Sequence, residues 1–274
     1  MGRIASMEEF RTITHLGTLF LLCGTLKADV PYEKIKTVRE KNRRLGLGLM
    51  GVHEWLLKRG YQYEVTEELH RWLTVYASQS EESSRTGSKE LSCSTPVANR
   101  AIAPTGTIGI MAGTTQGIEP LFAVAYRRRY LKAKQWHYQY VVDGTAQEMI
   151  DIYSVDPDKI ESALDLASDY KRRIAFQAHV QGYVDQSISS TINMPAWGSP
   201  GNNEDGVVAF AQTLAKYANR LRGFTVYPDG ARGGQPFTSV AYSEAKTKLG
   251  VEFNGCHEVH DVCSITGRGG TCAA

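Results

Sequence analysis

APTGTIGIMAGTTQGIEP, residues 103–120, is the stretch that decides the fold. A short apolar run precedes it, and Pro104 fixes the backbone where the chain leaves that run. Gly106 lets the backbone approach a ligand, and Thr105 and Thr107 add hydroxyl donors to the free amides of a helix that begins here. Such a turn can bind an anion without net charge. The pattern alone leaves two interpretations open, a phosphate loop and a plain turn.

Outward from this stretch, short apolar segments alternate with helical patterns, which indicates an α/β fold with a largely parallel sheet. The expected strands are residues 44–52, 100–103, 122–131, 190–194 and 223–227. Ligands bind at the carboxyl ends of parallel strands. The loops after Ala103, Met194 and Tyr227 are therefore expected to share one rim.

The expected helices cover this sheet. The sequence Ser6-Met7-Glu8-Glu9 is a capping box that predicts the start of a helix. Its apolar face would hold Phe10, Ile13, Leu16, Phe20 and Cys23. A helix over 67–77 precedes a serine-rich stretch, 78–94, which we expect to be a loop, and another helix is expected over 157–167. Four histidines on these helices or at their edges carry no expected role: His53, His70, His137 and His179.

The composition is that of an ordinary globular protein, with 274 residues, 42% hydrophobic and 22% charged. With 31 basic and 29 acidic residues the net charge is +2, which argues against nucleic-acid binding through a large excess of positive charge. The longest apolar stretch, at residues 16–26, falls well short of the roughly 20 residues that span a bilayer. No signal-peptide pattern is found, so we expect a cytoplasmic protein without a membrane partner.

Three further motifs stand in order around the opening stretch. They are RRLGLGLMG at 43–51, SSTINMP at 189–195 and TVYPDGAR at 225–232. Together with Gly117-Ile118-Glu119-Pro120 they resemble the large, catalytic subunit of ribonucleotide reductases. The resemblance covers roughly residues 1–245, and it departs at Gly109, where many members have serine.

The resemblance implies the second half of a ten-stranded α/β barrel over residues 1–245, followed by a flexible cysteine-containing tail at 246–274. The substrate would be a ribonucleoside di- or triphosphate, whose ribose 2′-hydroxyl is replaced by hydrogen through a radical route. The substrate phosphates would be held by Pro104, Thr105, Gly106, Thr107 and Ile108. Asn193 could face the substrate or satisfy backbone groups, whereas Glu119 is expected to be structural and to accept backbone amides.

The family's radical cysteine lies in an Asn-Pro-Cys-Gly-Glu loop, and this sequence contains no Pro-Cys-Gly-Glu. We therefore expect a split subunit or a fragment that needs a partner chain bearing the radical cysteine. Members that import a radical from a metal subunit carry two adjacent tyrosines where this sequence has Tyr227-Pro228. The resemblance thus favours the adenosylcobalamin-dependent class.

The last residues concentrate three of the five cysteines, Cys256, Cys263 and Cys272. Family tails of this kind regenerate an active-site disulfide, so Cys263 and Cys272, which flank a glycine-rich stretch, would exchange with a dithiol reductant such as a thioredoxin-like protein. A zinc site that uses Cys256, His257 or His260, and Cys263 is an alternative, although the spacing matches no standard finger. An inert tail is a third.

Three classes of function stay open on the sequence. The first is an enzyme part, the substrate-phosphate half of a ribonucleotide reductase. The second is a non-catalytic nucleotide-binding or regulatory module derived from that enzyme. The third is a zinc-dependent interaction protein built around the tail.

Overall fold

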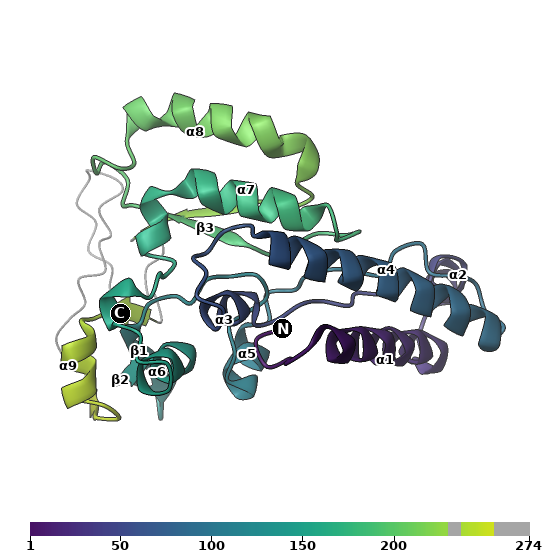
Figure 1. The fold of residues 1–274 in the computed structure, drawn as a ribbon, viewed down its shortest axis with the longest axis horizontal. Helices are drawn as coiled ribbons and strands as arrows, with labels where there is room; N and C mark the ends of the chain where they lie inside the picture. Colours follow the sequence, from purple (N-terminus) through teal and green to yellow (C-terminus); the bar gives the residue numbers. More distant parts are fainter. Residues whose placement is uncertain (230–236, 255–274) are drawn as a thin grey trace.

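Four short segments that pair in parallel lie in a row in the fold, and Figure 1 shows the helices and strands around them. The computed structural model describes residues 1–229 and 237–254. From one side to the other, the pairings are Leu47 with Arg100, Ile102 with Ile188, and β3 (Thr191–Met194) with β4 (Thr225–Pro228). These are four of the five segments that the sequence predicts as strands. Their carboxyl ends therefore meet at one rim, as expected.

The remaining elements surround these four segments. The helices are α1 (Met7–Lys27), α2 (Glu33–Asn42), α3 (Val52–Leu57), α4 (Glu67–Glu90), α5 (Gly106–Ala112), α6 (Gly144–Asp151), α7 (Tyr170–Gln181), α8 (Glu204–Tyr217) and α9 (Tyr242–Thr247). The other strands are β1 (Ala125–Lys132), β2 (Gln135–Val142), β5 (Phe237–Ser239) and β6 (Glu252–Asn254). The helix expected over 157–167 is instead two short 3₁₀ turns, at Pro157–Lys159 and Asp165–Ser168.

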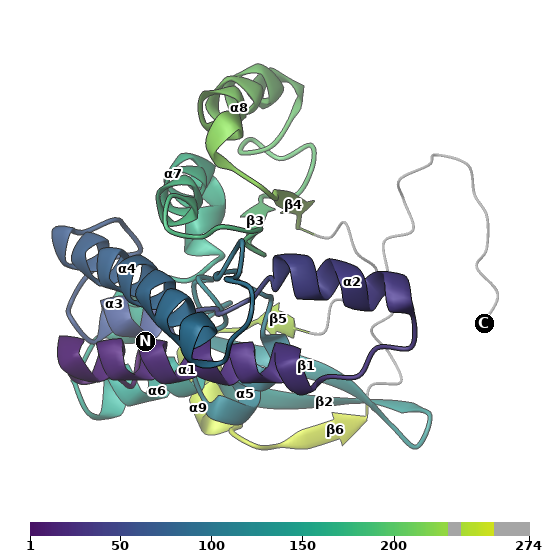
Figure 2. The ribbon, with the colours of Figure 1, turned by 90° about the vertical axis from the view of Figure 1, so that its right-hand side faces the viewer.

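The expectation of a largely parallel sheet is wrong for the second sheet. Its strands run in the order β5-β1-β2-β6, and every pairing is antiparallel. It lies on the opposite side of the molecule from α7 and α8 (Figure 2). The described residues form no closed barrel. The fold continues past residue 245, because α9 ends at Thr247 and β6 pairs with β2.

The β1–β2 hairpin has a turn without the usual sequence signature. Lys132 pairs with Gln135, so only Ala133 and Lys134 form the turn. Both have positive φ, 51° and 65°, a conformation that hairpins normally assign to Asn-Gly or Asp-Gly. Because neither position carries glycine or asparagine, no turn signal in the sequence predicts β2.

Helix α1 starts as predicted but turns its apolar face outward. The Ser6 side chain accepts a hydrogen bond from the Glu9 amide at 3.1 Å, as in a capping box. The buried residues of α1 are Phe10, Thr14, Thr18 and Leu22. Ile13, Leu16 and Phe20, which we expected to be buried with Phe10, are 45%, 58% and 78% exposed. The expected buried face is therefore wrong.

The reason for this orientation lies in α4, which continues through the serine-rich stretch that we expected to be a loop. Its serines donate to carbonyls of the preceding turn, for example Ser83 to Gln79 at 2.6 Å, so their hydroxyls do not interrupt the helix. Small residues then let α1 pack closely: a Cβ at Gly87 would lie 2.5 Å from the Leu19 side chain. Close packing of the two helices therefore buries the face of α1 that carries its buried threonines together with Leu22.

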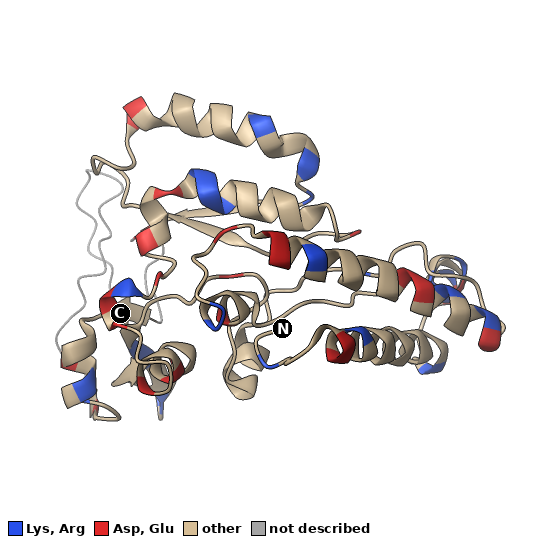
Figure 3. Cartoon of the chain, viewed as in Figure 1, with Lys and Arg blue, Asp and Glu red and all other residues tan. Residues whose placement is uncertain are grey.

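An aromatic core joins α3, α4 and α7. Trp55, Tyr63, Tyr76 and Phe176 are each fully buried or within 1% of it, and burial of each such side chain stabilises the fold by about 1.5–3 kcal/mol. In the view of Figure 3, acidic and basic residues are interspersed among the helices and are not gathered on one of them. Within residues 1–229 and 237–254, the helices are too short or too polar to cross a bilayer.

Candidate functional site

The predicted phosphate loop lies where one parallel segment passes into α5. Thr105 precedes the helix with φ 52° and ψ 26°, and its hydroxyl oxygen accepts a hydrogen bond from the Gly117 amide at 2.9 Å. Within the described residues no side chain caps α5. Helix geometry leaves the amides of Gly106, Thr107 and Ile108 without intrahelical acceptors, so they can bind an anion.

The Gly-Ile-Glu-Pro segment ties this loop to the next strand. One Glu119 carboxylate oxygen accepts from the Thr191 amide at 2.6 Å, and the other accepts from the Arg173 guanidinium at 2.5 Å. Arg173 also donates to the Thr191 carbonyl at 2.6 Å and is 3% exposed. The prediction that Glu119 is structural and accepts a backbone amide is confirmed.

Two buried rings hold the same segment from the other side. Nδ1 of His53 accepts from the Leu121 amide at 3.0 Å, and the Tyr63 hydroxyl donates to the Ile118 carbonyl. Burial, together with the charge of Arg173, lowers the pKa of His53 to about 3, so the ring is neutral and can accept this bond at neutral pH. Burial also raises the pKa of the Tyr63 hydroxyl, which stays protonated.

A cavity of about 350 Å³ lies at the carboxyl ends of β3 and β4. Asn193 and Tyr227 pair across the two strands and both line the cavity. Pro228 has no amide to donate, and the ladder continues through the Asp229 amide, which donates to the Met194 carbonyl at 2.9 Å. The rest of the lining is mostly apolar, with Phe122 and Leu164 among its residues. The cavity is at the small end of the range for ligand pockets.

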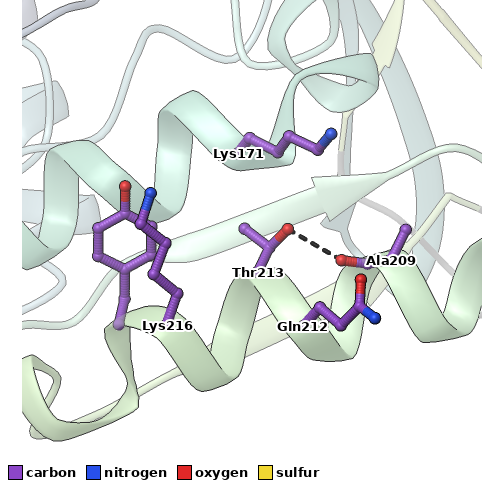
Figure 4. Close-up of a pocket in the computed structure, with 6 residues that line it drawn as sticks. Lys171, Ala209, Gln212, Thr213 and Lys216 are labelled. Carbon is purple, nitrogen blue, oxygen red and sulfur yellow. Dashed lines mark hydrogen bonds between the residues drawn. The ribbon is translucent and has the colours of Figure 1, made fainter.

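A second cavity, of about 340 Å³, lies between α7 and α8 rather than at the strand ends (Figure 4). Lys171 and Lys216 reach toward it from the two helices. The Thr213 hydroxyl, which also lines it, donates to the Ala209 carbonyl of its own helix at 2.9 Å. None of the residues predicted from the sequence to bind substrate lines this cavity.

The structure therefore places the phosphate loop and Asn193 on two neighbouring parallel segments, at the same rim. Sequence reasoning missed three residues that hold this arrangement: His53, Tyr63 and Arg173. No local pattern marks them, because each contacts residues more than 15 positions away in the sequence. Within the described residues no group of His, Cys, Asp and Glu could hold a metal ion. The predicted redox and zinc residues, Cys256, His257, His260, Cys263 and Cys272, lie outside the described residues.

Comparison with known proteins gives a consistent result. Residues 2–90 and 97–218 match the family model of the ribonucleotide reductase barrel domain. The chain is 28% identical over 261 residues to the vitamin B12-dependent ribonucleoside-diphosphate reductase of Mycobacterium tuberculosis H37Rv, an alignment that covers 82% of this chain and 36% of that protein. The vitamin B12-dependent ribonucleoside-diphosphate reductase of Thermoplasma acidophilum is 28% identical to this chain over 278 residues, an alignment that covers 87% of this chain and 35% of that protein.

Two solved structures share the fold. A B12-dependent, class II ribonucleotide reductase superposes with a TM-score of 0.70 at 15% identity, over 88% of this chain and 38% of that one. The class Id ribonucleotide reductase α subunit of Actinobacillus ureae gives 0.57 at 12% identity, over 80% and 46%. The chain thus spans little more than a third of the length of the curated relatives it matches.

Proposed function

Because the chain belongs to the ribonucleotide reductase barrel-domain family, we propose that it forms the substrate-phosphate part of a ribonucleotide reductase. That enzyme would convert ribonucleotides to deoxyribonucleotides. The observation that carries the proposal is the start of α5, where the Thr105 side chain bonds to Gly117 and leaves the first amides of the helix uncapped. The loop and Asn193 follow neighbouring parallel segments, so we infer that one nucleotide would bind the amides by its phosphates and Asn193 by its sugar.

The chain's own residues would bind and orient the substrate. The amides of Gly106, Thr107 and Ile108 would donate to the phosphate oxygens, and the hydroxyl of Thr107, an exposed residue, would join them. Pro104 would fix the entry to this loop. Asn193 would hydrogen-bond the nucleoside in the cavity between β3 and β4.

Adenosylcobalamin is the cofactor we propose, since curated relatives are named as B12-dependent and Pro228 takes the place of a redox tyrosine. When bound, it would supply the radical. The cavity of about 350 Å³ between β3 and β4 is too small for a corrin ring, so we assign it to the nucleoside and not to the cofactor.

We further propose two protein partners for turnover in the cytoplasm. One is the polypeptide that carries the radical cysteine, because the sequence has no Asn-Pro-Cys-Gly-Glu loop. The other is a thioredoxin-like dithiol reductant, which would exchange with Cys263 and Cys272.

A reduction assay tests the proposal. The purified chain is incubated with a ribonucleoside diphosphate, adenosylcobalamin and a dithiol, alone and after co-expression with a polypeptide that carries the Asn-Pro-Cys-Gly-Glu loop. Deoxynucleotide is expected only from the co-expressed assembly, and Thr107→Val should lower its yield more than Thr107→Ser, which keeps the hydroxyl. Absence of both product and association would refute the enzymatic function and favour a nucleotide-binding module.

A further inference from the structure

Glu119 and Arg173 together occupy both backbone hydrogen-bonding groups of one residue in β3. Glu119 accepts from the Thr191 amide at 2.6 Å, and Arg173 donates to the Thr191 carbonyl at 2.6 Å. On its other side Thr191 pairs with Thr225 of β4. The ion pair therefore takes the place that a neighbouring strand would have along this part of β3.

The same pair is connected to the phosphate loop by a short chain of contacts. Glu119 is two residues beyond Gly117, whose amide donates to the Thr105 hydroxyl at the start of α5. The other end of this series of contacts is Thr191, which lies two residues before Asn193. The side chains of Thr191 and Asn193 therefore point to the same side of the strand. The segment between the two ends is held by the Tyr63 hydroxyl at the Ile118 carbonyl.

Burial makes this connection stiff. Arg173 is 3% exposed, and the Glu119 side chain is 21% exposed. Removal of Glu119 would leave the Arg173 charge buried without its counterion, which the structure can relieve by moving the loop or the strand.

We propose that Glu119 and Arg173 are positioning residues that fix the α5 amides relative to Asn193, so that one nucleotide can bind by its phosphates and by its sugar at once. The inference rests on the proposed function and adds the device that sets the spacing between the two halves of the site. The role assigned to both residues is to position these groups, without a contact to the substrate.

The chain offers a matched control at the other end of the same segments. Asp185 accepts from the amides of Asn99 and Arg100, at 2.8 and 3.0 Å, and pairs with the Arg100 guanidinium at 2.8 Å. It is also a carboxylate that joins two parallel segments and a buried arginine, but it lies at their amino ends. Asp185→Asn should lower stability without changing the rim.

The experiment compares wild type, Glu119→Gln, Glu119→Ala and Asp185→Asn by calorimetric titration with cytidine diphosphate, inorganic diphosphate and cytidine. Glu119→Ala should weaken binding of the nucleotide at least about ten-fold, because misplacement of a binding group by about 1 Å has effects of this size or larger. Binding of inorganic diphosphate, which needs only α5, should change less than about three-fold by the same reasoning. Glu119→Gln keeps an oxygen for the Thr191 amide and should restore part of the loss.

The outcomes separate the two proposals. Suppose that wild type binds the nucleotide and that Glu119→Ala binds it as tightly as Asp185→Asn does. The positioning role is then refuted and the proposed function stands. If the alanine variant does not fold, the same comparison is made with Glu119→Gln. Equal losses for the nucleotide and for inorganic diphosphate would also refute the positioning role, since they would indicate general damage to the loop. If wild type binds no phosphate-bearing ligand, the proposed function fails, and the positioning role fails with it.

Discussion

Replacement of Gly48 by alanine tests the register of the parallel segments. A Cβ at this position would lie 2.8 Å from the Ala101 carbonyl oxygen, a distance that requires backbone movement. Overpacking of this kind costs about 1–3 kcal/mol. For a protein of this size each kcal/mol lowers Tm by about 2–4 °C, so a decrease of about 2–12 °C is expected. The matched control is Gly46→Ala, whose Cβ would meet only the Ala101 side chain, at 3.7 Å.

Urea unfolding followed by circular dichroism gives the free energies of unfolding of both variants. Gly48→Ala should lose about 1–3 kcal/mol. Gly46→Ala should change by less than about 1 kcal/mol, since loss of chain entropy in the unfolded state can even stabilise it. Equal effects of the two substitutions would refute the reasoning, because the close approach of residue 48 to the strand that leads into the phosphate loop would then be incorrect.

Three further predictions follow from individual side chains. The pKa of His53 lies at about 3 in the folded protein, below its ordinary value of 6.5, so the unfolded chain binds more protons and stability should fall as pH decreases from about 6.5 toward 3. Urea unfolding at a series of pH values should show this slope in wild type, and an equally steep slope in His53→Gln would contradict the assignment. Leu22→Ala should lower the free energy of unfolding by about 2–5 kcal/mol and Leu16→Ala by about 0.5 kcal/mol or less, because only Leu22 is buried. Thermal or urea unfolding measures both losses, and a larger loss for Leu16→Ala would show that the expected face of this helix is the buried one after all. In an active co-expressed assembly, Cys263→Ser or Cys272→Ser should abolish repeated turnover with a thioredoxin-like reductant but leave a single turnover intact, and undiminished steady-state product would exclude the redox tail.

The rim was predictable from sequence because its parts are local. A strand, a Thr-Gly-Thr turn and a short helix follow one another within a dozen residues, and parallel strands place such turns at one edge. Four predicted segments pair in this way, and Asn193 lies at the expected strand end. Its role in binding stays a prediction.

What the sequence could not predict depends on packing between distant segments. The buried face of α1 is set by the small residues of α4, so the apolar periodicity of α1 alone indicated the wrong side. The ion pair of Glu119 with Arg173 joins residues 54 positions apart. In the same way, β2 was missed because the hairpin turn uses Ala133 and Lys134 where glycine or asparagine would have been recognised.

The most direct test of the central claim, that the start of α5 binds the phosphates of a ribonucleotide, is a titration of ¹⁵N-labelled chain with cytidine diphosphate and with cytidine, followed by NMR at the backbone amides. Saturable shifts of Gly106, Thr107 and Ile108 with the diphosphate, and none at these amides with cytidine, are predicted. Shifts confined to the lysine-lined cavity between α7 and α8, or equal shifts with the two ligands, would contradict the account.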